Sequence, residues 1–185
     1  MPTILSHPLV ALALRPWLQR ATPSRTPLPA AVVLAGAAGA MLPDVDVLGF
    51  ALHVPYGSTF GHRGFTHSIV FALLAGAMAA LLLRRDRRTF AFVVLCTLSH
   101  PLLDALTNGG RGVAFFSPFS NHRYFFPWRP IEVSPIGRFD PSVFASELRW
   151  VWLPCIVAAV MARIPQSIDR HGRGSGASGA GPGGG

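Results

Sequence analysis

The chain has 185 residues, enough for one compact domain, and its composition argues against a soluble protein. Half of the residues are hydrophobic, only 13% are charged and the mean hydropathy is +0.42, whereas soluble domains carry roughly 25% charged residues. The net charge is +8, and every basic residue is Arg. Because these arginines lie between apolar stretches and form no single stripe with interleaved aromatic residues, nucleic acid is not an expected partner.

Five apolar stretches predict an all-α, multi-span membrane domain of about four to five helices. They are residues 4–18, 30–52, 68–83, 89–106 and 148–164. A spanning helix needs about 20 mostly apolar residues, with a range of about 17–25. We therefore expect four spanning helices and an N-terminal fifth within a membrane-embedded domain of residues 1–165.

The connecting segments differ in kind. Residues 19–29 form a Pro-rich linker, and the sequence RRDRR at 84–88 predicts a tight turn between two spans. The segment 108–147 is rich in Gly, Pro, Phe and Arg, shows no helical period and predicts a long irregular loop over a functional site. Residues 166–185 are Gly-rich, which is typical of a disordered tail.

The distribution of arginine predicts the orientation of the spans. By the positive-inside rule, the cluster at 84–88 is expected on the cytoplasmic side. Counting spans from this cluster places ten arginines inside and six outside. In this arrangement, the His and Asp residues described next all approach the outer face.

The first group of ionisable residues is Asp44 and Asp46, in the string Leu-Pro-Asp-Val-Asp. We expect Pro43 to end the regular helix, so that an extended or turn backbone aims both carboxylates at one cation. The alternative is a polar turn that closes a helix, because turns favour Asp. Taken alone, this pattern favours the turn.

The second group is His62 and His67, in the string His-Arg-Gly-Phe-Thr-His-Ser. Gly64 permits a bend that can bring both imidazoles to one ion, and histidine is the commonest metal ligand near neutral pH. Arg63 lies between them and suits an oxyanion or a phosphate. The alternative is a chance pair of loop histidines.

The third group is His100 and Asp104, which lie four residues apart and therefore share a helix face. They can chelate a metal or form an imidazole oriented by a carboxylate, although Pro101 is expected to bend this helix locally. Ionisable groups flanked by Phe, Val and Leu are costly in a membrane unless they face a partner or a cavity. The alternative is an interfacial helix end whose polar groups contact water.

With His7, these groups offer four histidines and three of the eight acidic residues to one site. The candidate metal ligands are His7, Asp44, Asp46, His62, His67, His100 and Asp104. Mixed nitrogen and oxygen ligation suits zinc, manganese or iron, of which we favour zinc. Seven ligands also suit two clustered metals, an arrangement that usually hydrolyses phosphoesters or amides.

These motifs resemble the YdjM-like family of bacterial membrane-bound metal-dependent hydrolases. The resemblance begins with Ser6-His7 and continues with Leu-Pro-Asp-Val-Asp, His-Arg-Gly-Phe-Thr-His-Ser and Leu-Ser-His-Pro-Leu-Leu-Asp-Ala-Leu-Thr-Asn-Gly-Gly. A late Phe- and Pro-rich run completes it, so that the motifs cover residues 6 to about 155. The family implies a multi-helix protein of the inner membrane with metal-dependent hydrolase activity.

We therefore expect a multi-pass enzyme of the bacterial inner membrane that uses a metal-activated water on a phosphoester or another anionic substrate, including a lipid. Asp46 and Asp104 are the expected general bases, and Arg63 is the third expected catalytic residue. Arg63, Arg123 and Arg129 are expected to bind the anionic substrate. Membrane lipids are the expected surroundings.

The alternative is a non-catalytic membrane protein, because intramembrane His and Asp serve transport and structure equally well. It would be a metal or proton transporter, or a scaffold with a structural metal site. A continuous polar path across the helices would favour the transporter. An open coordination position beside Arg63 would favour the hydrolase.

Overall fold

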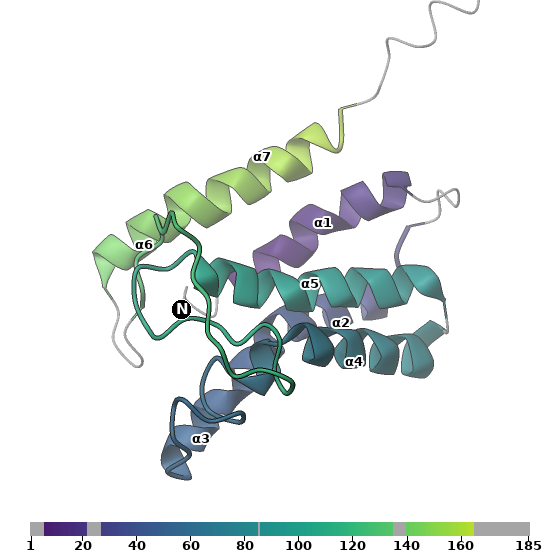
Figure 1. The fold of residues 1–185 in the computed structure, drawn as a ribbon. Coiled ribbons are helices and arrows are strands. Elements are labelled where there is room, and N and C mark those ends of the chain that lie inside the picture. Colours follow the sequence, from purple (N-terminus) through teal and green to yellow (C-terminus); the bar gives the residue numbers. More distant parts are fainter. Residues whose placement is uncertain (1–5, 22–26, 85, 135–139, 165–185) are drawn as a thin grey trace, which may run out of the picture.

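The computed structural model describes residues 6–21, 27–84, 86–134 and 140–164 (Figure 1). Within these residues the regular structure is helical, and extended chain pairs only at two isolated bridges, Thr107 with Ile131 and Val113 with Tyr124. The predicted all-α class is therefore confirmed. The predicted tail lies outside the described residues.

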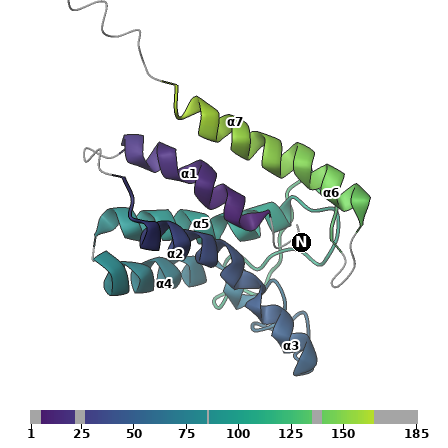
Figure 2. The same ribbon diagram turned by 180° about the vertical axis from the view of Figure 1, so that it is seen from behind.

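Four helices form the layer that positions the site. They are α1 (His7–Ala21), α2 (Ala30–Met41), α4 (Ile69–Ala79) and α5 (Arg87–Ala105). Helix α5 packs against the other three (Figure 1). Helix α7 (Leu153–Met161) lies along α1 on the side away from α4, as the view from behind also shows (Figure 2).

Close packing of α2 against α5 depends on two glycines. A Cβ atom at Gly36 would lie 2.4 Å from the ring of Phe92, and one at Gly39 would lie 2.7 Å from Thr97 Oγ1. Small residues that let two helix backbones approach are typical of helix packing in membranes. This close packing of α2 on α5 matters for the site because it fixes the end of α2 beside the end of α5.

The second apolar stretch is helical almost throughout. Helix α2 continues into a 3-10 segment, η1 (Leu42–Val47), and then into the short helix α3 (Leu48–Ala51). Regular α-helix therefore ends at Met41, just before Pro43, and of the extended or turn backbone expected there the structure has 3-10 turns. Pro43 lies at the start of η1, where its missing N–H costs no intrahelical hydrogen bond.

The segment 108–147 was expected to be irregular throughout, and its last part is not. Helix α6 (Pro141–Glu147) continues through the π-helical turn η4 (Leu148–Trp152) into α7. The Asp140 side chain caps α6 by accepting a hydrogen bond from the Ser142 N–H, and Pro141 occupies the first helical turn. Both are helix-start signals that the sequence contains.

Fewer helices qualify as membrane spans than the predicted four to five. Among the described residues, Ala30–Ala51 and Pro141–Met161 are long and apolar enough, and Ile69–Leu83 is a shorter apolar helix. Helix α1 has only 15 residues and contains Arg15 and Arg20. Helix α5 has charged or ionisable residues at both ends, which lowers its mean hydropathy.

Candidate metal centre

The predicted ligands meet at one end of the helical layer. Helices α1 and α4 begin at this end, and α2 and α5 end there (Figure 1). Three overlapping groups of three side chains hold their ligand atoms within 4.8 Å of one another. The groups are His7, Asp44 and His100; Asp44, His62 and His67; and His67, His100 and Asp104.

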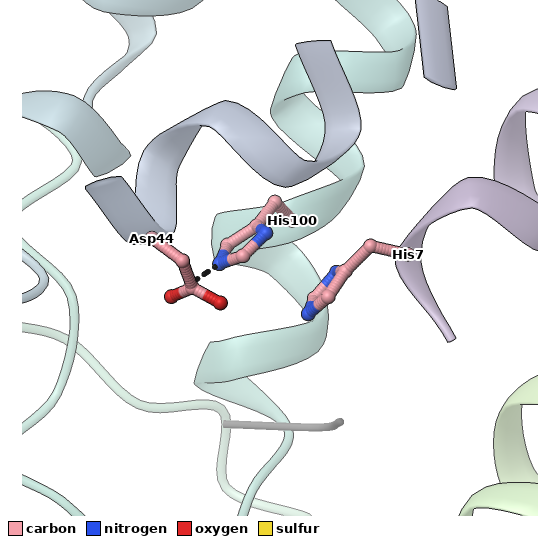
Figure 3. Close-up of side chains that lie close together, drawn as sticks. All are labelled: His7, Asp44 and His100. Atoms are coloured by element: carbon pink, nitrogen blue, oxygen red, sulfur yellow. Dashed lines mark ion pairs between the residues drawn. The ribbon is translucent and has the colours of Figure 1, made fainter. Parts of the chain in front are cut away.

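The first group joins three separate elements (Figure 3). The rings of His7 on α1 and His100 on α5 stack with their centroids 3.8 Å apart and an interplanar angle of 15°. Asp44 on η1 completes the group, with its Oδ1 atom 3.2 Å from His100 Nε2. Both nitrogens of His7 are buried without a hydrogen-bond partner.

The backbone fixes which nitrogen of His100 faces the centre. His100 Nδ1 lies 2.8 Å from the Ala40 carbonyl oxygen, which can only accept a hydrogen bond, so Nδ1 carries a proton. In the neutral ring, Nε2 then directs a lone pair at the Asp44 carboxylate. This arrangement is unfavourable unless a proton or a metal ion lies between them, and it is the orientation that a metal-binding histidine adopts.

His67 and Asp104 have the separation expected of two ligands of one ion. His67 Nε2 lies 3.3 Å from Asp104 Oδ2 and 3.8 Å from Asp44 Oδ1. Ligand atoms about 2.0–2.1 Å from a tetrahedral zinc ion lie about 3.3 Å apart. The 3.2 Å separation of His100 Nε2 and Asp44 Oδ1 also agrees with this value.

Asp46 lies behind the histidines. Its carboxylate contacts His62 Nδ1 at 2.6 Å and His67 Nδ1 at 3.1 Å, so both Nε2 atoms remain available to the centre. It also accepts hydrogen bonds from the Thr66 hydroxyl and the Arg63 backbone N–H. This is the position of a carboxylate that orients metal-binding histidines, and it leaves Asp46 less able to act as a general base.

Charge around His67 determines its protonation in the metal-free protein. Burial opposes protonation, but the contacts with Asp104 and Asp46 outweigh it and raise the pKa of His67 to about 9. A metal ion that binds His67 must therefore displace a proton at neutral pH.

Arg63 is buried beneath the centre, with only 1% of its surface exposed. Its Nε lies 2.9 Å from Asp104 Oδ2, and its two terminal nitrogens donate to the Gly109 carbonyl and the Thr107 hydroxyl. A Cβ atom at Gly110 would lie 2.6 Å from the Arg63 guanidinium, so this position requires glycine. Arg63 therefore holds Asp104 in place. The predicted contact of Arg63 with substrate stays a prediction.

The other two arginines predicted to bind substrate differ in position. Arg123 donates to the backbone carbonyls of Tyr56 at 2.7 Å and His62 at 2.9 Å, and thereby ties down the loop that carries His62. Arg129 is exposed and stacks over the ring of Phe125. Arg123 therefore supports the loop that carries His62, and the contact of Arg129 with substrate stays a prediction.

Glu147 is a buried residue that the sequence analysis missed. Its side chain is completely buried, and its Oε2 atom accepts a hydrogen bond from Ser6 Oγ at 2.5 Å. Trp152 Nε1 donates to the same Ser6 oxygen at 2.8 Å. Since Ser6 precedes His7, these contacts tie the ligand-bearing start of α1 to α6 and η4. The available signal was a carboxylate directly before an apolar stretch.

The donor set fits a divalent cation of the zinc class. Buried polar atoms are nearly always hydrogen-bonded, yet both Asp44 oxygens, Asp104 Oδ1, His100 Nε2 and both His7 nitrogens have no hydrogen-bond partner. Imidazole nitrogens combined with carboxylate oxygens suit zinc, manganese and iron.

Comparison with known proteins agrees with the motifs. The profile of the family described as YdjM inner membrane protein matches residues 1–167. The chain belongs to the YdjM family. This confirms the resemblance to a bacterial inner-membrane family. The chain is also 41% identical over 165 residues to Inner membrane protein YbcI of Escherichia coli (strain K12), covering 83% of this chain and 92% of that relative. No solved structure matches.

Proposed function

We propose that this YdjM-family protein is a multi-pass, metal-dependent hydrolase of the inner membrane that acts on an anionic ester, with a phosphoester favoured. The observation that supports the proposal is the buried cluster of imidazoles and carboxylates, in which the nitrogens of His7, Nε2 of His100 and both oxygens of Asp44 lack hydrogen-bond partners. Such a cluster is costly to bury unless it binds a cation.

Exposed apolar side chains support several membrane crossings. On α7, Leu153, Ile156, Val157 and Val160 are each 50–58% exposed. Helix α4 likewise exposes Leu74 and Met78. Large contiguous apolar surfaces of this kind mark contact with a membrane or a partner. Helices α4 and α7 then face lipid on opposite sides of α5, which itself exposes Leu95 and Leu102.

The chain's own residues divide the chemical work. A divalent cation bound here would lower the pKa of water toward 7 and polarise an ester oxygen. His7, His67, His100, Asp44 and Asp104 would hold it, and zinc is favoured. Asp46 and Arg63 orient those residues. Arg63 holds Asp104 Oδ2 while Oδ1 makes no hydrogen bond, so Oδ1 would bind the cation or, if the cation leaves it free, accept a proton from the water.

The opening of the centre suggests an amphipathic substrate. Asp44 and His62 have the most exposed side chains of the ligand groups, at 7% and 6%. Val45 and Phe50, in the neighbouring turn and helix, are exposed and apolar. A lipid phosphoester would present its charged group to the cation beside Asp44 and His62 and its apolar chain to this surface.

The distribution of buried charge favours a local site over a transport path. Across the described residues, every buried Asp, Glu, His or Arg lies at the end of the molecule that holds the centre. The core between the helices beyond it is apolar and includes Val32, Phe92 and Val93. The second candidate function is a structural metal site, which the near-complete burial of the ligand groups favours.

Metal content and hydrolysis measured on the same detergent-purified samples test the proposal. Wild-type protein should retain metal and hydrolyse bis-p-nitrophenyl phosphate or a short-chain phospholipid. His67→Gln should lower both metal content and hydrolysis, since it removes a ligand. His122→Gln is the matched control, because His122 is exposed and packs on Tyr124 outside the centre. A metal-loaded wild type that hydrolyses nothing above background would instead support the structural role.

A further inference from the structure

We propose that the centre holds two divalent cations and that the Asp44 carboxylate bridges them. This inference rests on the proposed metal centre and concerns how many ions it holds. The three ligand groups overlap in pairs, and each pair shares one residue: Asp44, His67 or His100. If two ions occupy two of these groups, the residue that the two groups share must bind both ions.

Neither shared histidine can serve two ions. His67 Nδ1 is engaged by Asp46 Oδ2 and the Thr66 hydroxyl, both at 3.1 Å. His100 Nδ1 is engaged by the Ala40 carbonyl. Each ring therefore has only Nε2 left, and that nitrogen offers a single lone pair.

Asp44 has the properties that a bridge requires. A carboxylate offers two oxygens with about four lone-pair positions, and both Asp44 oxygens are buried without a hydrogen-bond partner. Its Oδ1 atom lies between the two rings, 3.2 Å from His100 Nε2 and 3.8 Å from His67 Nε2. Asp44 belongs both to the group that contains His7 and to the group that contains His62. Neither of these histidines belongs to the third group.

This choice assigns the ligands to two ions. The first ion would take His7, His100 and one oxygen of Asp44, and the second would take His62 and His67 with the other oxygen. Asp104 lies between the two sets, since its Oδ2 atom is 3.3 Å from His67 Nε2 and 3.9 Å from His100 Nε2.

The charge balance indicates an anionic third component. With neutral histidines, the three aspartates and Arg63 leave the centre with two negative charges. One divalent cation neutralises the centre, and a second makes it positive. The second ion should therefore bind more weakly than the first. Inorganic phosphate, an anion, should strengthen the binding of the second ion. Two-metal sites use this excess charge to stabilise the attacking and leaving oxygens of a phosphoester.

Zinc stoichiometry tests the assignment without reference to turnover. The full chain in detergent is stripped with a chelator, reloaded with zinc in the presence of phosphate and analysed by mass spectrometry. Wild type and the His122→Gln control should hold two zinc ions per chain, whereas His7→Gln and His62→Gln should each hold one. A wild type saturated at one ion would overturn the proposal.

Manganese loading tests the bridge itself. Two Mn²⁺ ions joined by Asp44 should give an exchange-coupled electron paramagnetic resonance spectrum in wild type, and His7→Gln should give the six-line spectrum of an isolated ion. Two uncoupled ions in wild type would contradict the bridge, even with the expected stoichiometry. A coupled pair without hydrolysis would sink the hydrolase proposal alone, and hydrolysis with one ion would sink only the two-ion inference.

Discussion

At the scale of single residues, the centre depends on what holds the outer nitrogen of three of its four histidines. Asp46 engages the Nδ1 atoms of His62 and His67, and the Ala40 carbonyl engages that of His100. Each contact fixes a ring so that Nε2 points inward. The carbonyl of Ala40 can accept this hydrogen bond only because α2 ends beside α5. No sequence motif predicts this contact.

Removal of Arg63 should destabilise the protein. Arg63→Gln leaves the fully buried Asp104 carboxylate without its cation, and breaking a buried pair in this way costs roughly 3–5 kcal/mol. We expect a clear fall in Tm in detergent and a smaller fall for Arg63→Lys, which keeps the charge without the three-way contact. Arg129→Gln, at an exposed position, is the control. An unchanged Tm in Arg63→Gln would show that Asp104 does not need this partner.

Zinc affinity should rise with pH. Because the pKa of His67 is raised to about 9 in the metal-free protein, zinc competes with a proton throughout the neutral range. The apparent affinity should increase about tenfold per pH unit below pH 9, and about 100-fold between pH 6 and pH 8. Competition with a chromophoric chelator measures this. A flat profile would mean that His67 is not a ligand.

The same shift has a consequence for stability without metal. The folded-state pKa of His67 lies above the ordinary value of 6.5, so its protonation stabilises the folded protein fully below pH 6.5. This contribution is lost as the pH rises through about 9. Metal-free protein should therefore show a falling Tm between pH 6.5 and 9, and His67→Gln should remove that part of the fall.

At the scale of elements, Ser6 and Glu147 hold the start of α1 against the C-terminal helices. Glu147→Ala removes the acceptor for a buried hydroxyl, and a hydrogen bond to a charged group contributes about 1.5–3 kcal/mol. We expect a lower Tm and weaker zinc binding, because His7 loses its support. Ser142→Ala, in the exposed first turn of α6, should leave zinc affinity unchanged. Equal zinc affinity in both variants would show that His7 needs no such anchor.

The sequence predicts some elements better than others, for physical reasons. Apolar stretches revealed the long helices, and ligands at the ends of those stretches were predicted to converge because neighbouring helices end together. The sequence left extended and turn backbone both open around Pro43 and did not specify the 3-10 segment found there, since proline fits the first turn of a helix as well as it ends one. Nothing local distinguishes Asp44 from Asp46; only the fold turns one toward the rings' Nε2 atoms and the other toward Nδ1.

At the scale of the whole molecule, the centre and the arginine-rich turn lie at opposite ends of the helices (Figure 1). Arg20 on α1 donates to the carbonyl of Ile164 beyond α7, so the end of α7 also lies away from the centre. From the positive-inside rule we predict that the turn lies in the cytoplasm and that the centre faces the periplasm.

Cysteine labelling tests this orientation in cells. In a background without Cys96 and Cys155, Arg87→Cys marks the turn and His122→Cys marks the loop beside the centre; both positions are exposed. A membrane-impermeant maleimide should label residue 122 in intact spheroplasts and residue 87 only after lysis. The reverse pattern would invert the topology.

The metal centre is tested most directly by X-ray absorption at the zinc edge of the zinc-loaded protein. We predict a first shell of nitrogen and oxygen at about 2.0–2.1 Å, with the outer-shell scattering of several imidazoles and no sulfur. The zinc that a His67→Gln, His100→Gln double variant still binds should show weaker imidazole scattering, since only His7 and His62 remain as histidine ligands. Zinc bound through sulfur at about 2.3 Å, or through oxygen alone, would contradict the assignment of these histidines and aspartates as the metal ligands.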